Sequence, residues 1–159
     1  VCVCVCVCVC VCIFVPDPLF LRLIPVHPSI QLKFDRRQQV DELLQKKEKK
    51  VVGAISIHQW SPWAMAIGNE IENYRKTGKL QLFLLDADVD TNKAWEIGGH
   101  TSPAMVFWFE GNPLTIRRSG WPDDQKVVGA LNKEQLASLL NGLKEVEDSG
   151  SEKLVVIEG

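Results

Sequence analysis

Two mainly apolar runs, residues 51–57 and 80–86, constrain the fold of this chain more than any other sequence feature. An apolar run of this length without alternation is typical of a strand that is covered on both faces. Helical spacing of apolar residues predicts a helix over about 63–77 between the two runs, ended by Gly78. The apolar face of this helix comprises Ile67, Ile71 and Tyr74. A strand, a helix and a second strand in this order indicate an α/β domain.

Two further helices are predicted from capping patterns. Asp35 and Gln38 form a capping-box pattern before a helix that reaches the Lys-rich stretch 46–50. Asn132 and Gln135 form a second capping box, followed by apolar residues at helical spacing. The apolar stripe of this last helix comprises Leu136, Leu139, Leu140, Leu143 and Val146.

The second half of the chain also carries strand signals. Residues 104–109 and about 114–118 are predicted to form an antiparallel hairpin, joined by a Gly-Asn turn at 111–112. A last short strand is expected at 153–157, and a short helix at about 91–97. Together these elements predict a mixed central sheet with helices on both faces.

All six Cys of the 159-residue chain lie in a Val-Cys repeat that covers residues 1–12. We expect residues 1–28 to be a low-complexity extension, either disordered or translated from non-coding sequence, and residues 29–159 to form one domain. The absence of Cys after residue 12 excludes a disulfide framework, a Cys-based zinc site and a thiol nucleophile from that domain. A net charge of −2 gives no basis for strong direct RNA binding. The N-terminal apolar run is interrupted too early to span a membrane.

Three local signals in this order of elements resemble thioredoxins. Residues 60–63 (Trp-Ser-Pro-Trp) lie before the helix at 63–77, where thioredoxins have a Trp-x-x-Trp leading into their Cys pair. Residues 85–90 (Leu-Asp-Ala-Asp-Val-Asp) are similar to the Val-Asp-Val-Asp strand end of that superfamily. Ser102-Pro103 precedes the strand at 104–109, where thioredoxins carry a cis-proline.

The resemblance implies a thioredoxin-like fold in which Ala64 and Ile67 occupy the positions of the two active-site Cys. Thioredoxin chemistry needs a thiolate at a helix N-terminus and a second thiol that resolves the mixed disulfide. Because neither thiol is present, we expect the domain to be no enzyme and to use no cofactor or metal.

A closer resemblance concerns residues 119–129 (Ser-Gly-Trp-Pro-Asp-Asp-Gln-Lys-Val-Val-Gly). They resemble the Gly-x-Pro-Asp-x-x-Lys-x-Val-Gly stretch of the Dim-type thioredoxin-like proteins of the spliceosomal U-five particle. The aromatic triplet at 107–109, the Val-Asp pair at 40–41 and the stretch at 153–156 match further features of this family. The chain departs from this family's pattern in two places. Ser61 and Ala64 replace family residues around the start of the second helix, and the acidic stretch 145–152 replaces a basic C-terminal stretch.

The Dim-type resemblance implies a nuclear, non-catalytic subunit that binds spliceosomal proteins in pre-mRNA splicing and has no small-molecule substrate. The candidate contact residues are Trp60, Pro62, Trp63, Pro103, Trp121, Asp123 and Asp124. Packing over the sheet edge is the alternative role for Trp60 and Trp63. An adaptor or chaperone-type domain outside splicing, and a redox protein that uses the N-terminal thiols, are the alternative functions.

Two weaker patterns involve His and Arg side chains. His58 and His100 lack an acidic partner or a nucleophile in the sequence pattern, so we expect them to be solvated or packed rather than catalytic. The Arg pair at 117–118 and the Asp pair at 123–124 are expected to close the hairpin by local ion pairs or to form a polar rim for a partner.

Overall fold

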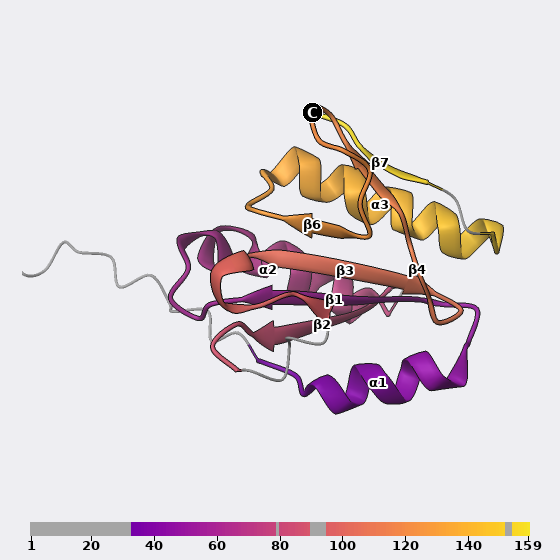
Figure 1. The fold of residues 1–159 in the computed structure, drawn as a ribbon, viewed down its shortest axis with the longest axis horizontal. Helices are drawn as coiled ribbons and strands as arrows, with labels where there is room; N and C mark the ends of the chain where they lie inside the picture. The colour runs from indigo at the N-terminus through magenta and orange to yellow at the C-terminus, as the bar shows by residue number, and fades with distance from the viewer. Residues whose placement is uncertain (1–32, 79, 90–94, 152–153) are drawn as a thin grey trace, which may run out of the picture.

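The computed structural model describes residues 33–78, 80–89, 95–151 and 154–159 (Figure 1). Its elements are α1 (Arg37–Lys46), β1 (Val51–Ile57), α2 (Pro62–Thr77), β2 (Gln81–Asp86), the 3₁₀ helix η3 (Gly99–Thr101), β3 (Ala104–Phe109), β4 (Asn112–Pro113), β5 (Ile116–Arg118), β6 (Lys126–Val128), α3 (Lys133–Ser149) and β7 (Val155–Ile157). The extension at 1–28 and most of the helix expected at 91–97 lie outside the described residues. Within the described ranges, no helix combines the length and the apolar character needed to cross a bilayer.

Strand β1 is central in a five-stranded sheet whose path runs β2–β1–β3–β4, with β6 also paired to β3. It runs parallel to β2 and antiparallel to β3. Every residue of β1 is buried, because the strand has a neighbour on each side and helices above and below it. The expected strand at 51–57 is therefore confirmed.

Helices α2 and α3 cover one face of this sheet, and α1 covers the other (Figure 1). On the first face, Ile55 and Phe107 pack in one core with the buried residues of α2 and α3. On the opposite face, Ala54 and Val106 pack with Val40 of α1. The parallel β1–α2–β2 unit, the antiparallel β3 and the helices on both faces make the fold thioredoxin-like, as expected.

The local signals for α2 and α3 are confirmed. Gly78 ends α2 with a φ of 63°, in the left-handed region that suits glycine. At the start of α3, the Gln135 N–H donates to the Asn132 side chain at 2.8 Å, and the Asn132 N–H donates to the Gln135 side chain at 3.3 Å. All five residues of the predicted apolar stripe of α3 are buried.

The expected capping role of Asp35 is wrong. Helix α1 begins one residue later, at Arg37, and the Arg36 N–H donates to the Gln39 side chain at 2.8 Å. Asp35 instead accepts hydrogen bonds from the Leu84 N–H at 3.0 Å and from the Arg75 guanidinium at 2.8 Å. Its own N–H donates to the Leu84 carbonyl, so residue 35 is bound to the edge of β2 and is no longer available to cap α1.

The hairpin predicted after residue 109 is also wrong in its second strand. Only the short β4 returns along β3, and the pairing ends where the Leu114 N–H donates to the Phe107 carbonyl at 2.8 Å. Strand β5 leaves the sheet and pairs with β7 in parallel. Its other edge exchanges backbone hydrogen bonds with Asp124. The vacated part of β3 is paired by β6, from the segment 119–129.

The last strand, expected at 153–157, is present as β7 over Val155–Ile157, and residue 153 lies outside the described residues. It lies against α3, where a Cβ at Gly142 would meet Val155 at 2.9 Å. The absence of a side chain at Gly142 therefore allows this close approach of helix and strand.

Candidate functional site

The loop after β1 presents an exposed aromatic side chain. Trp60 is 70 % exposed, and its ring stacks on His58 with centroids 4.8 Å apart. Nδ1 of His58 lies 2.9 Å from Oδ1 of Asp88, which follows β2. His58 thus has an acidic partner that the sequence pattern did not suggest, because the two residues come from different strand ends.

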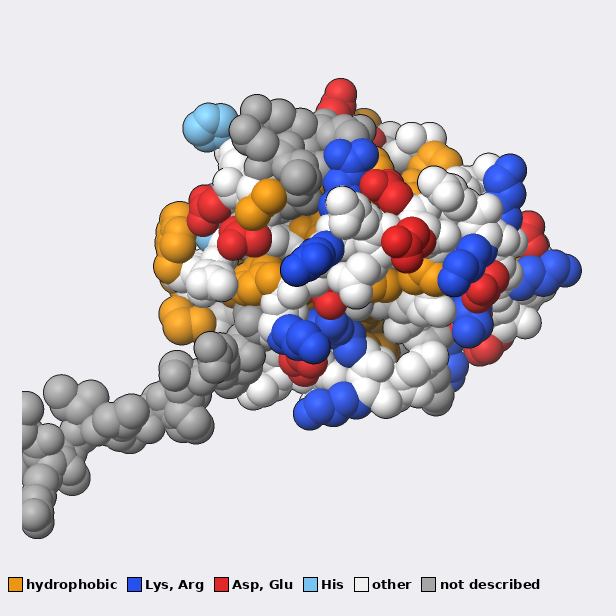
Figure 2. Space-filling view, turned by 90° about the horizontal axis from the view of Figure 1, so that it is seen from below, with side chains coloured by type: hydrophobic (Ala, Val, Ile, Leu, Met, Phe, Trp, Pro, Cys, Tyr) orange, Lys and Arg blue, Asp and Glu red, His pale blue; other side chains and the backbone are white. Residues whose placement is uncertain are grey.

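Two further exposed apolar side chains lie on the segments around Trp60. Met65 is in the first turn of α2, and Val89 follows β2. Seen from below, hydrophobic side chains gather at the left-hand end of the molecule, where β1 and β2 end, with acidic side chains beside them (Figure 2). The exposure of Met65 and Val89 could not be predicted, since a lone apolar residue carries no sign of its exposure in the sequence.

Trp63 has a different environment from Trp60. Its side chain is half-buried against the main core, and its Nε1–H donates to the Leu131 carbonyl at 2.6 Å. The packing alternative therefore describes Trp63, whereas Trp60 faces solvent. Pro62 is exposed and is the first residue of α2, a position that tolerates proline because its N–H would be unpaired in any case.

The two positions that the resemblance matches to thiols lie in the core. Ala64 is fully buried and Ile67 is 2 % exposed, both in the core between α2 and the sheet. Positions three apart on a helix share a face, and here that face is the one that packs on the sheet.

Pro103 follows a cis peptide bond and is half-buried. Its carbonyl accepts a hydrogen bond from the Gly129 N–H at 2.8 Å. Trp63 contacts Leu131, two residues further along the same segment. The start of α2 and the Pro103 loop are thus both attached to the chain that leaves β6.

The segment 119–129 carries the second exposed indole. Trp121 is 60 % exposed, and the Arg118 guanidinium lies 5.5 Å from its ring centroid. Arg117 binds Asp123 through two hydrogen bonds of 2.7 and 2.8 Å. These hydrogen bonds lower the pKa of Asp123 and raise the pKa of Arg117. The ion pair expected between the Arg and Asp pairs is therefore present for 117 and 123.

Asp124 acts mainly through its backbone. Its N–H and carbonyl exchange hydrogen bonds with Ile116, at 3.1 and 2.8 Å. Its side chain accepts from the N–H of Gln125 at 2.7 Å. Asp124 therefore closes the loop against β5, while Asp123 anchors the loop through its side chain.

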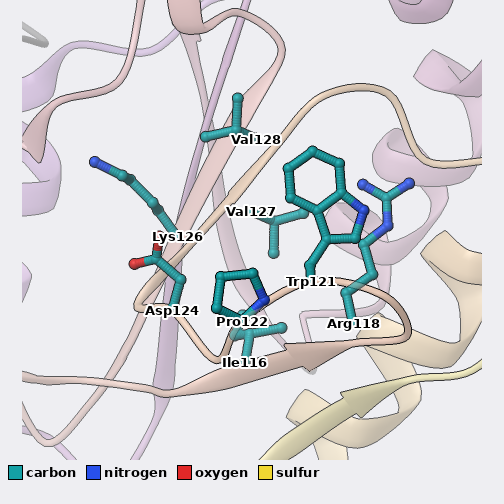
Figure 3. A pocket seen from close by; sticks show the side chains of 8 residues that line it. All are labelled: Ile116, Arg118, Trp121, Pro122, Asp124, Lys126, Val127 and Val128. Atoms are coloured by element: carbon teal, nitrogen blue, oxygen red, sulfur yellow. The ribbon is translucent and has the colours of Figure 1, made fainter.

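Between β5 and β6 lies a hollow that we call the Trp121 pocket (Figure 3). It is lined by Ile116, Pro122, Val127 and Val128, with Trp121 and Arg118 at one end and Asp124 and Lys126 at the other. Lys126 binds Glu96 at 2.5 Å, a hydrogen bond that raises the pKa of Lys126 and lowers that of Glu96. Trp121 could be predicted here from its sequence, but its grouping with Arg118, Val127 and Val128 could not, because the pocket depends on the unexpected strand β6.

The described part of the chain holds no group of three His, Cys, Asp or Glu side chains that could bind a metal ion. The arrangement offers instead exposed indoles, an apolar hollow and a guanidinium, which are features of contact surfaces.

Comparisons with known proteins identify no family for the chain. No family model matches it, and no curated protein matches it. Among solved structures, it is similar to the X-ray structure of thioredoxin from Fasciola hepatica, at 14 % identity and a TM-score of 0.49. That match covers 65 % of this chain and 90 % of the thioredoxin.

Proposed function

We propose that this chain is a redox-inactive, protein-binding subunit of the spliceosome, of the kind found in the U-five particle or the tri-snRNP. In this proposal it acts in the nucleus, in pre-mRNA splicing, through contacts with other proteins. It binds RNA weakly if at all, and it is no enzyme. The observation that carries the binding role is the pair of indoles, Trp60 and Trp121, which are 70 % and 60 % exposed on a domain that needs neither for its core.

Exposed Trp side chains favour protein binding because aromatic residues dominate the energetics of protein interfaces. Trp60 lies beside the start of α2, and Trp121 lies in the loop that leads into β6. The chain that follows β6 binds both the Pro103 carbonyl, through Gly129, and Trp63 at the start of α2, through Leu131.

The chemistry of the thiol-equivalent positions supports a role without redox activity. Disulfide exchange requires an accessible thiolate. Ala64 and Ile67 supply no sulfur atom, and their side chains are buried in the core. The only Cys residues of the chain belong to the N-terminal repeat.

The splicing assignment depends on the Dim-type resemblance of residues 119–129. Two observations agree with a contact role for this stretch: it forms β6, and it leaves Trp121 exposed. An adaptor outside splicing would use the same surface, so the identity of the captured proteins decides between the two.

The test is affinity capture with the tagged full chain from nuclear extract, followed by mass spectrometry. We expect U-five and tri-snRNP proteins with the unchanged chain and their loss with the double variant Trp121→Ala, Asp123→Ala. The matched control is Gln38→Ala, Lys49→Ala, which changes two exposed residues on or near α1. Recovery of a cytosolic chaperone set, or of no splicing protein, would refute the splicing role.

A second assay addresses the redox alternative. The full chain and a variant with all six Cys changed to Ser are compared in insulin-disulfide reduction. We expect neither to exceed a buffer blank. Turnover that disappears in the Ser variant would assign redox chemistry to the N-terminal thiols and overturn the proposal.

A further inference from the structure

We infer that the Trp121 pocket binds a short linear segment of a partner protein in which an acidic side chain lies next to an apolar one. This inference rests on the proposed function only in taking the ligand to be a protein. It adds the chemical class of the ligand, which follows from the apolar surface and the charges of the pocket.

The apolar part of the pocket fits an aliphatic or aromatic side chain. Ile116 and Val127 are nearly fully buried and form its floor, while Val128 is 36 % exposed at its side. The Trp121 indole lies at the same end of the pocket as Arg118 (Figure 3). An apolar side chain seated there would remove both the indole and the valine from water, which is favourable.

The charges of the pocket leave one cation without a carboxylate. Lys126 is bound by Glu96 and also lies in the field of Asp124. The neighbouring Arg117 is bound by Asp123. In the part of the chain that the structure describes, the Arg118 guanidinium forms no ion pair and lies over the ring of Trp121.

Strand geometry explains why Arg118 rather than Arg117 belongs to the pocket. Side chains alternate along a strand, so Ile116 and Arg118 share the pocket side of β5, while Arg117 points to the opposite side. Stacking on the indole keeps the planar guanidinium at the edge of the apolar floor. Its fork of N–H donors matches a carboxylate, which it can bind through two hydrogen bonds.

An acidic peptide also agrees better than a single-stranded RNA with the surroundings. A base could stack on Trp121, but a phosphate backbone would then run beside the carboxylates of Asp123 and Asp124. The net charge of −2 gives no further attraction for a polyanion. A peptide places only one negative charge next to Arg118.

The test begins with selection of short random peptides, displayed on phage, on the immobilised full chain. We expect enriched peptides to carry Asp or Glu within two positions of Leu, Ile or Phe. The enriched peptides are then synthesised with a fluorescent label, and their dissociation constants are measured by anisotropy. Arg118→Ala is expected to weaken binding about tenfold, the loss typical of a charge-assisted hydrogen bond.

Two further variants separate charge from shape. Lys49→Ala removes the same charge from an exposed site near α1 and is expected to leave affinity unchanged. Trp121→Ala is expected to weaken binding at least as much as Arg118→Ala, and circular dichroism establishes that each variant is folded. The inference is overturned by failure to enrich any peptide, by enrichment of basic or uncharged peptides, or by equal affinity for Arg118→Ala. Arg118-dependent binding of labelled oligo(U) that exceeds peptide binding would also overturn it.

The outcomes distinguish this inference from the splicing role. Arg118-dependent binding of acidic peptides, without capture of splicing proteins, keeps the pocket assignment and removes the splicing proposal. Capture of splicing proteins that is equally strong with Arg118→Ala keeps the splicing proposal and removes the pocket assignment.

Discussion

Replacing Trp63 by Phe tests whether the indole joins the start of α2 to the segment after β6. The substitution removes the 2.6 Å hydrogen bond from Nε1 to the Leu131 carbonyl. Leu131 is 2 % exposed, so we expect its carbonyl to lose its partner without full access to water. A buried carbonyl left unpaired costs about 1–3 kcal/mol. The phenyl ring is also smaller than the indole, so some packing is lost. Together the two effects are expected to lower the free energy of unfolding by about 2–3 kcal/mol and the melting temperature by about 5–10 °C.

The matched control is the same substitution at the exposed indole. Trp121 is 60 % exposed, so Trp121→Phe is expected to change stability by less than about 0.5 kcal/mol. Urea unfolding followed by far-ultraviolet circular dichroism measures both variants without relying on Trp fluorescence. Equal unfolding midpoints for the two variants, or an unchanged midpoint for Trp63→Phe, would refute the anchoring role of Trp63.

Three further predictions concern the sheet, its edge and the loop. Gly53→Ala is expected to lower the free energy of unfolding by about 1–3 kcal/mol, because the added Cβ would lie 2.7 Å from the Phe107 ring. An unchanged urea midpoint would argue against this packing. Asp35→Ala removes an acceptor shared by α2 and β2 and is expected to cost about 1–3 kcal/mol, measured by the same unfolding assay. Arg117→Ala is expected to raise the pKa of Asp123 towards its ordinary value in a carboxyl NMR titration. Since that pKa is lowered in the folded chain, the pairing stabilises the fold at pH values above the ordinary carboxyl pKa. This stabilisation is lost as the pH falls through the lowered pKa. An Asp123 pKa that is the same in Arg117→Ala would contradict the pairing.

The elements that could be predicted from the sequence are those whose signals are local. Helix α3 carries its own capping box, and the phase of its apolar stripe matches its buried face. Strand β1 is apolar except for the buried Ser56, and its place between β2 and β3 agrees with that composition. In both cases the residues that determine the element lie within it.

The errors occur where a distant contact decides between two local possibilities. Asp35 has the sequence pattern of a cap, but the contact with Leu84, 49 positions away, takes its side chain. Residues 116–118 have a strand pattern that does not say which strand they join, and they pair with β7. Residues 126–128 are too few to show a pattern of their own, and β6 exists because β3 offers a free edge there.

The candidate site shows the same dependence at the level of single side chains. Trp60 and Trp63 look equivalent in the sequence, yet one is exposed and the other is bound to Leu131. The start of α2 at Pro62 makes the difference, because Trp60 then precedes the helix while Trp63 lies in its first turn.

The beginning of α2 also separates the exposed apolar side chains at this end of the domain from the two positions that the resemblance matches to thiols. Ala64 and Ile67 lie on the helix face that packs on the sheet, so their side chains add to the core. Met65 lies between them in sequence and is 61 % exposed. The exposed apolar surface at this end of the domain therefore comes from residues outside the thiol-equivalent pair.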